Sequence, residues 1–116
     1  MRLRLDIRVP SLPGAERRAL EAAFEQVRVP PGEIWVVSVI ESAPDEWLLL
    51  LTGGGEREVF SHDWSFVAVE ESERGERVCT YARRIPAGEH SPAGMARSVD
   101  QLLRAAGPAR APGEPA

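Results

Sequence analysis

The stretch Glu33-Ile-Trp-Val-Val-Ser-Val-Ile-Glu-Ser-Ala-Pro-Asp-Glu-Trp-Leu-Leu-Leu-Leu-Thr52 contains two apolar segments separated by a short polar break. The first segment, 34–40, consists of β-branched and aromatic residues apart from Ser38, which is typical of a strand. The break at 42–45 has the composition of a turn that neither strand can contain. We therefore predict a hairpin of two central strands, against which the rest of the chain packs.

Both faces of this hairpin are apolar. Side chains alternate along a strand, so Trp35, Val37 and Val39 point away from their even-numbered neighbours, which are also largely aliphatic. An antiparallel sheet covered on one side has a polar outer face. We therefore expect the second face of the sheet to be covered as well. Three coverings are possible: the sheet curls on itself around a cavity, a second copy of the chain packs there, or a different protein does.

The residues before the hairpin predict one strand and one helix. Charged and apolar residues alternate strictly over 2–9, as in a half-buried strand. Over 15–27 the apolar residues recur at helical spacing and form one stripe, made of Leu20, Ala23, Phe24 and Val27. The sequence Pro30-Pro31-Gly32 ends the helix, because neither proline donates a helical hydrogen bond.

Three further strands are expected after the hairpin. The glycines at 53–55 favour a tight reversal, because glycine tolerates positive φ. Strands are predicted at 56–61, 64–70 and 77–85. The last two are joined by a polar turn with Gly75 where a left-handed residue belongs.

The second helix has clear sequence signals at both ends. Ser91 is a typical N-cap, Pro92 suits the first helical position, and Gly107-Pro108 ends the helix. Its apolar stripe consists of Met95, Val99, Leu102, Leu103 and Ala106. Residues 108–116 are rich in proline, alanine and glycine and bury too little to fold. We expect a single domain over 1–107 and a disordered tail over 108–116.

The predicted order is β-α-β-β-β-β-β-α, an α+β antiparallel meander with two helices on one face of the sheet. This order is similar to that of helix-grip ligand-binding folds. The resemblance covers the element order and no sequence motif. It implies a curled sheet with a pocket for a small apolar ligand under the C-terminal helix.

Composition excludes several classes of function. The chain of 116 residues has a net charge of -4, which argues against nucleic-acid binding. All 14 basic residues are arginine, and without lysine the chain has neither a Schiff-base nucleophile nor a phosphate-loop lysine. The bias towards arginine, alanine, glycine and proline indicates a GC-rich bacterial genome.

The single cysteine, Cys79, forms no internal disulfide and builds no cysteine-based metal site, which favours a reducing compartment. The N-terminus lacks the apolar core of a signal peptide, and no segment approaches the roughly 20 apolar residues of a membrane span. We expect a cytoplasmic protein that does not associate with a membrane.

The chemistry-bearing residues favour a protein without a catalytic role. Ser61-His62-Asp63 are consecutive, so their side chains diverge and do not form a triad. Cys79 and His90 are conceivable as nucleophile and base, but a cysteine in the middle of a strand is typically a buried small residue. The two histidines lack metal-ligand spacing. We expect no metal and no cofactor, and an enzyme using His62 or Cys79 is the least favoured interpretation.

Four residues are candidates for binding. Trp35 and Val37 are chosen as apolar residues of the central strand, since tryptophan is enriched at binding hot spots. Arg83 and Arg84, close to His90, are candidates for an anion or an acidic partner, although a solvated strand end is the favoured explanation of these charges.

The preferred function is a non-catalytic bacterial interaction module, such as an accessory subunit, an inhibitor or an immunity-type protein. It would bind a protein partner or its own copy through an apolar sheet face. The alternative is a small-ligand carrier with a helix-grip-like pocket between the curled sheet and the C-terminal helix.

Overall fold

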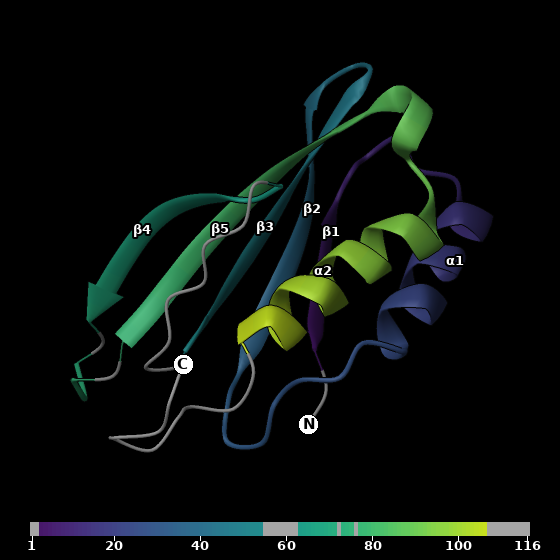
Figure 1. The fold of residues 1–116 in the computed structure, drawn as a ribbon. Helices are drawn as coiled ribbons and strands as arrows, with labels where there is room; N and C mark the ends of the chain where they lie inside the picture. Colours follow the sequence, from purple (N-terminus) through teal and green to yellow (C-terminus); the bar gives the residue numbers. More distant parts are fainter. Residues whose placement is uncertain (1–2, 55–62, 72, 76, 107–116) are drawn as a thin grey trace.

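The computed structural model describes residues 3–54, 63–71, 73–75 and 77–106, and this part of the chain folds into one sheet and two α-helices (Figure 1). The strands and helices are β1 (Arg4–Arg8), α1 (Gly14–Glu25), β2 (Trp35–Ala43), β3 (Glu46–Gly54), β4 (Ser65–Glu71), β5 (Arg77–Pro86) and α2 (Pro92–Ala106). A short 3-10 helix, Ala87–Glu89, joins β5 to α2. The α+β class is therefore confirmed.

The sheet is mixed, with the strand order β1-β2-β3-β5-β4. β1 pairs with β2 in parallel, and the other three pairs are antiparallel. The predicted antiparallel meander is thus wrong at β1, and β5 lies between β3 and β4 instead of following β4 at the edge. The parallel pair arises because α1 returns the chain to the end of the sheet at which β1 began. The strand predicted at 56–61 lies outside the described residues.

The central hairpin is confirmed. β2 and β3 are antiparallel neighbours with Val37 opposite Leu51 and Val39 opposite Leu49. Pro44-Asp45 forms the two-residue connection, and the register shifts between Glu41 and Ala43. With two strands on one side of it and two on the other, β3 is the middle strand of the sheet.

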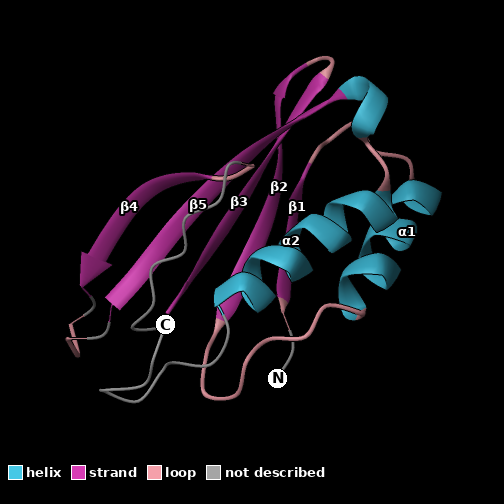
Figure 2. Cartoon of the chain, in the orientation of Figure 1, coloured by secondary structure: helices cyan, strands magenta, loops and turns pink. Residues whose placement is uncertain are grey.

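Both helices lie side by side on the same side of the sheet (Figures 1 and 2). Their buried residues join one core with the odd-numbered strand residues, and we call this helix-facing side of the sheet the inner face. Its strand residues include Trp35, Val37, Val39, Leu49, Leu51, Cys79, Tyr81 and Ile85, and the helices add Leu20, Phe24, Met95, Val99, Leu102 and Leu103. From the apolar stripes predicted for the two helices, these six residues pack on the strands.

The start of α2 and the turn before β5 match their sequence signals. The backbone N–H of Gly94 donates to the Ser91 hydroxyl oxygen at 3.3 Å, and the N–H of Met95 donates to the Ser91 carbonyl oxygen at 2.9 Å. Ser91 is therefore the N-cap of α2. Gly75 has a φ of 79°, the left-handed conformation expected for it.

Gly53 has a different role from the predicted reversal. It lies within β3, and its φ is not positive. A Cβ atom at this position would lie 2.6 Å from the Ile34 carbonyl oxygen and would overlap the Trp35 ring. Glycine is needed here so that the Trp35 indole can lie across β3.

Candidate functional site

The side of the sheet opposite to the helices is lined by aliphatic and small hydroxyl side chains. These even-numbered residues alternate with the buried ones and are all partly exposed. We call this side the outer face and its centre the outer patch, which consists of Val36, Ser38, Ile40, Leu48, Leu50, Thr52, Thr80 and Ala82. No helix within the described residues covers the outer patch (Figure 1).

The outer patch has an apolar middle with few polar groups. Leu50 lies at its centre, on the middle strand, with Ser38 opposite it on β2 and Ala82 opposite it on β5. The hydroxyl oxygens of Thr52 and Thr80 lie 3.3 Å apart, so they bond to each other. This pairing reduces the number of polar groups that a partner would have to satisfy.

The two rims of the outer face differ in charge. On β1, Arg4, Asp6 and Arg8 are in register with the outer residues of β2. Arg8 Nε lies 2.8 Å from Asp6 Oδ2, whereas Arg4 is exposed and has no ion pair within the described residues. On β4, the exposed Glu70 is in register with Val78 and likewise has no ion pair in the described part of the chain. Among the described residues, one rim therefore carries a cation without an ion pair and the other carries an anion without one.

Trp35 and Val37, two of the predicted binding residues, lie in the core. Their exposed fractions are 4% and 0%. The Trp35 indole donates from Nε1 to Glu33 Oε1 at 3.0 Å, and its ring lies 6.3 Å from that of Tyr81. Their placement on an open sheet face is corrected, because the register puts the odd-numbered residues of β2 under the helices.

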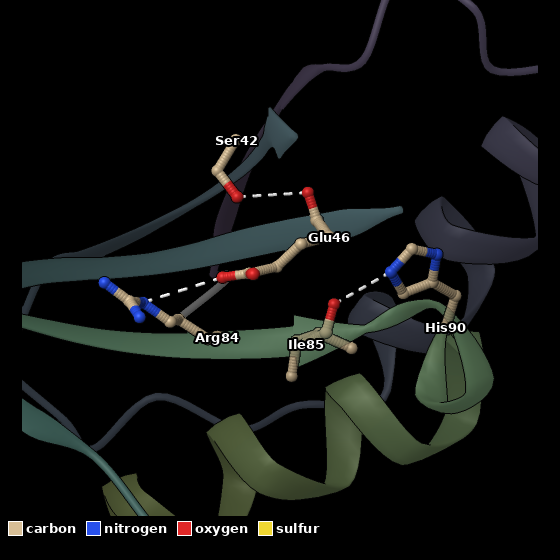
Figure 3. A network of polar contacts seen from close by, with 5 residues as sticks. All are labelled: Ser42, Glu46, Arg84, Ile85 and His90. Atoms are coloured by element: carbon tan, nitrogen blue, oxygen red, sulfur yellow. Dashed lines mark hydrogen bonds and ion pairs between the residues drawn. The ribbon is translucent and has the colours of Figure 1, made fainter. Parts of the chain in front are cut away.

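Arg83 and Arg84 point to opposite faces of β5, as consecutive strand residues do. Arg84 is exposed on the outer face, with Nε 3.6 Å from Glu46 Oε1 (Figure 3). Arg83 is half-buried on the inner face and lines a hollow of about 280 Å³ at the start of α2. Both residues border one hollow of about 640 Å³ beside the start of β4. Their binding of an anion or an acidic partner stays a prediction.

His90 contacts two strands at the end of the sheet, which sequence reasoning missed. Its Nε2 lies 2.8 Å from the Ile85 carbonyl oxygen (Figure 3), and because a carbonyl only accepts, this nitrogen carries the proton. Its ring stacks on Trp47. The sequence around Trp47 gave no sign that its ring stacks on His90, because the two residues are more than forty positions apart in the chain.

The structure separates the predicted nucleophile and base. Cys79 is 1% exposed and lies six residues before Ile85 on β5, so about 20 Å of strand separates it from the carbonyl that His90 contacts. Asp63 is exposed, and Ser61 and His62 lie outside the described residues. Within the described ranges, no group of three His, Cys, Asp or Glu side chains is placed to hold a metal ion. No helix in that part of the chain is long and apolar enough to span a membrane.

The edge strand β4 carries a second apolar surface that the sequence did not reveal. Phe66, Val67 and Val69 are 38%, 56% and 44% exposed. The register shifts between Phe66 and Ala68, and the Phe66 ring meets the Tyr81 ring edge-on at 5.5 Å. The alternating pattern predicted the strand, but it did not show that the strand lies at an edge.

Comparison of the chain with models of protein families, with curated proteins and with solved structures gives no significant match.

Proposed function

We propose that the chain is a non-catalytic interaction module that binds a protein through the outer face. One observation carries the proposal: both helices pack on the inner face, while the partly exposed outer patch has no described helix over it (Figure 2). Sheets that face water on one side are polar there, and this one has Val36, Ile40, Leu48 and Leu50 near its centre.

The size of the hydrophobic term is sufficient for association. If about 600 Å² of apolar surface on the two partners leaves water, the gain is on the order of 15 kcal/mol. Association itself costs about 4–15 kcal/mol in lost translational and rotational freedom. The balance favours binding that is weak to moderate, as expected of a regulatory or accessory contact.

The biological setting follows from composition and is part of the proposal. An acidic chain without lysine, with one buried cysteine and an arginine-rich composition, suits an accessory subunit, an inhibitor or an immunity-type protein of the bacterial cytoplasm. The partner surface would be apolar at its centre, because the outer patch offers few hydrogen-bonding groups.

The test places one charge at the centre of the outer patch. Leu50→Arg should abolish complex formation by tagged protein in cells of the native host, because an arginine there is desolvated without a counter-charge. Gln101→Arg is the matched control, since it adds the same charge to the exposed side of α2. Complexes that survive Leu50→Arg, with the fold intact by circular dichroism, would refute binding through this face.

The small-ligand carrier is a second proposal, supported by the hollow of about 280 Å³ between β5 and α2. Its lining combines the apolar Ile85 and Met95 with the charged Arg83 and Glu89. Ligand sites are typically about 300–1,000 Å³, so this hollow suits a small polar-headed molecule. Met95→Trp should fill it and remove any ligand-induced change in tryptophan fluorescence. A panel of ligands that gives no change with the wild-type protein would contradict this proposal.

A further inference from the structure

We propose that the occupant of the outer face is a second copy of this chain, related by a two-fold axis that runs along the strands over β3. This inference rests on the proposed function, because it names the partner of the same surface. In a two-fold dimer, one patch meets the same patch of its copy, so the patch must be complementary to itself. The outer face meets this condition in shape and in charge.

The strand order provides the shape. Because β3 is the middle strand, rotation about an axis along it places β3 over β3 of the second copy, β2 over β5, and β1 over β4. Leu48, Leu50 and Thr52 then meet their own copies at the centre. To either side, the register places Val36 over Thr80 and Ser38 over Ala82 of the other copy. Leucines therefore meet at the axis and smaller side chains meet beside it, which allows two sheets to pack at about 10 Å.

The rims provide the charge. With this axis, the β1 rim of one copy lies over the β4 rim of the other. The register puts Arg4 over Ala68 of the second copy, and Glu70 lies two residues, or about 7 Å, further along that strand, within reach of the long arginine side chain. Neither residue has an ion pair within the described chain, and the symmetry forms this contact twice. An axis across the strands would instead place Arg4 over Arg8 and Asp6 over Asp6. Like charges directly opposite are destabilising, and the axis along the strands avoids them on both rims. On β3 it brings Glu46 near its own copy, but this carboxylate is paired with Arg84.

The available area sets the affinity. Five strands about 4.8 Å apart and about six residues long, at about 3.3 Å per residue, present about 500 Å² per copy. The total of about 1,000 Å² is at the low end for a specific interface. We therefore expect a reversible dimer with a dissociation constant in the micromolar range, which appears only at higher protein concentration.

Sedimentation equilibrium of the full chain from about 1 µM to about 1 mM is the direct measurement. The wild-type protein should pass from monomer to dimer over this range. Leu50→Arg puts two arginines against each other on the axis and should raise the dissociation constant at least about a hundredfold. Gln101→Arg should leave the equilibrium unchanged. Ser38→Arg, at a smaller side chain of the same patch, repeats the test if Leu50→Arg does not fold.

Charge reversal at two exposed residues tests the axis without disturbing the core. Arg4→Glu alone and Glu70→Arg alone should each weaken the dimer about three- to tenfold, because both place like charges together. The double variant Arg4→Glu with Glu70→Arg should recover the wild-type dissociation constant. Single variants without effect, or a double variant weaker than either, would overturn this orientation.

The outcomes separate this inference from the function on which it rests. A wild-type monomer at all concentrations overturns the dimer, yet the proposed function stands if Leu50→Arg still abolishes a complex with another protein. A monomer without any such complex overturns both. A dimer that Val67→Arg dissociates and Leu50→Arg does not is formed through the edge of β4, and this result also overturns the inference.

Discussion

The imidazole of His90 lies flat on the indole of Trp47, with ring centroids 4.1 Å apart and an interplanar angle of 15°. The same imidazole bonds through Nε2 to the Ile85 carbonyl oxygen at 2.8 Å. Trp47 and Ile85 are register partners on β3 and β5. One side chain just before α2 thus contacts two central strands, and it fixes where the second helix begins relative to the sheet.

His90→Ala should lower the free energy of unfolding by about 1–3 kcal/mol, because it removes a stacked ring pair and leaves a strand carbonyl without its partner. Urea denaturation followed by tryptophan fluorescence measures the change. Glu89→Ala alters the exposed neighbouring residue and should shift stability by less than about 0.5 kcal/mol. Equal effects of the two substitutions would show that the stacking has no structural role.

Gly53→Ala should destabilise the protein by at least about 2 kcal/mol, because the added methyl group overlaps the Trp35 ring and the Ile34 carbonyl. The sheet has no room to move there, since Gly53 lies between β2 and β5. Gly88→Ala is the control, because nothing lies within 4 Å of the Cβ that it adds. Thermal unfolding of the two variants compares them directly. A Gly53→Ala protein as stable as Gly88→Ala would contradict the packing described for Trp35.

The sequence predicted those elements whose signals are local. These signals depend on residues that are close together in the sequence. They are the alternation before Pro10, the apolar runs on either side of Pro44-Asp45 and the apolar stripes of both helices. Their boundaries agree with the structure to within a few residues. The N-cap at Ser91 and the left-handed Gly75 were also predicted, because each depends on one residue's own chemistry.

The order in which the strands pair and the face of the sheet that the helices cover were not predicted, because both depend on residues distant in the chain. The position of β5 between β3 and β4 is set by contacts that no short pattern encodes. Sequence periodicity showed that the central strand is apolar on both faces, but not which face the helices would cover. Trp35 and Val37 were therefore placed on the wrong side, and the candidate surface is formed by their even-numbered neighbours. The parallel pairing of β1 with β2 could have been predicted, because a strand-helix-strand order typically joins two parallel strands.

Ser91→Ala should cost about 1 kcal/mol of stability, since the N–H of Gly94 loses its acceptor at the first turn of α2. Ser91→Asp should retain most of this stability, because a carboxylate caps the same N–H and favours the positive end of the helix. Guanidinium denaturation monitored by circular dichroism gives both values. The capping role would be refuted if alanine and aspartate lowered stability equally.

The thiol of Cys79 should react with an aromatic disulfide reagent only when the sheet opens. Cys79 is 1% exposed on the inner face, with Gly53 opposite it on β3 and Val69 opposite it on β4. Since it is the chain's single cysteine, the reaction reports one site. We expect labelling in native buffer to be at least about a hundredfold slower than in denaturant, because burial protects the thiol until the structure opens.

An exposed thiol provides the control for this experiment. Gln101→Cys in a Cys79→Ala background places a thiol on the outer side of α2, and it should react at the rate of an unprotected cysteine. The Gly53→Ala substitution should speed labelling of Cys79, because it loosens the strand that packs beside it. Native labelling of Cys79 as fast as that of the Gln101→Cys thiol would show that β5 is open to solvent, and the inner face would then not be the closed core described above.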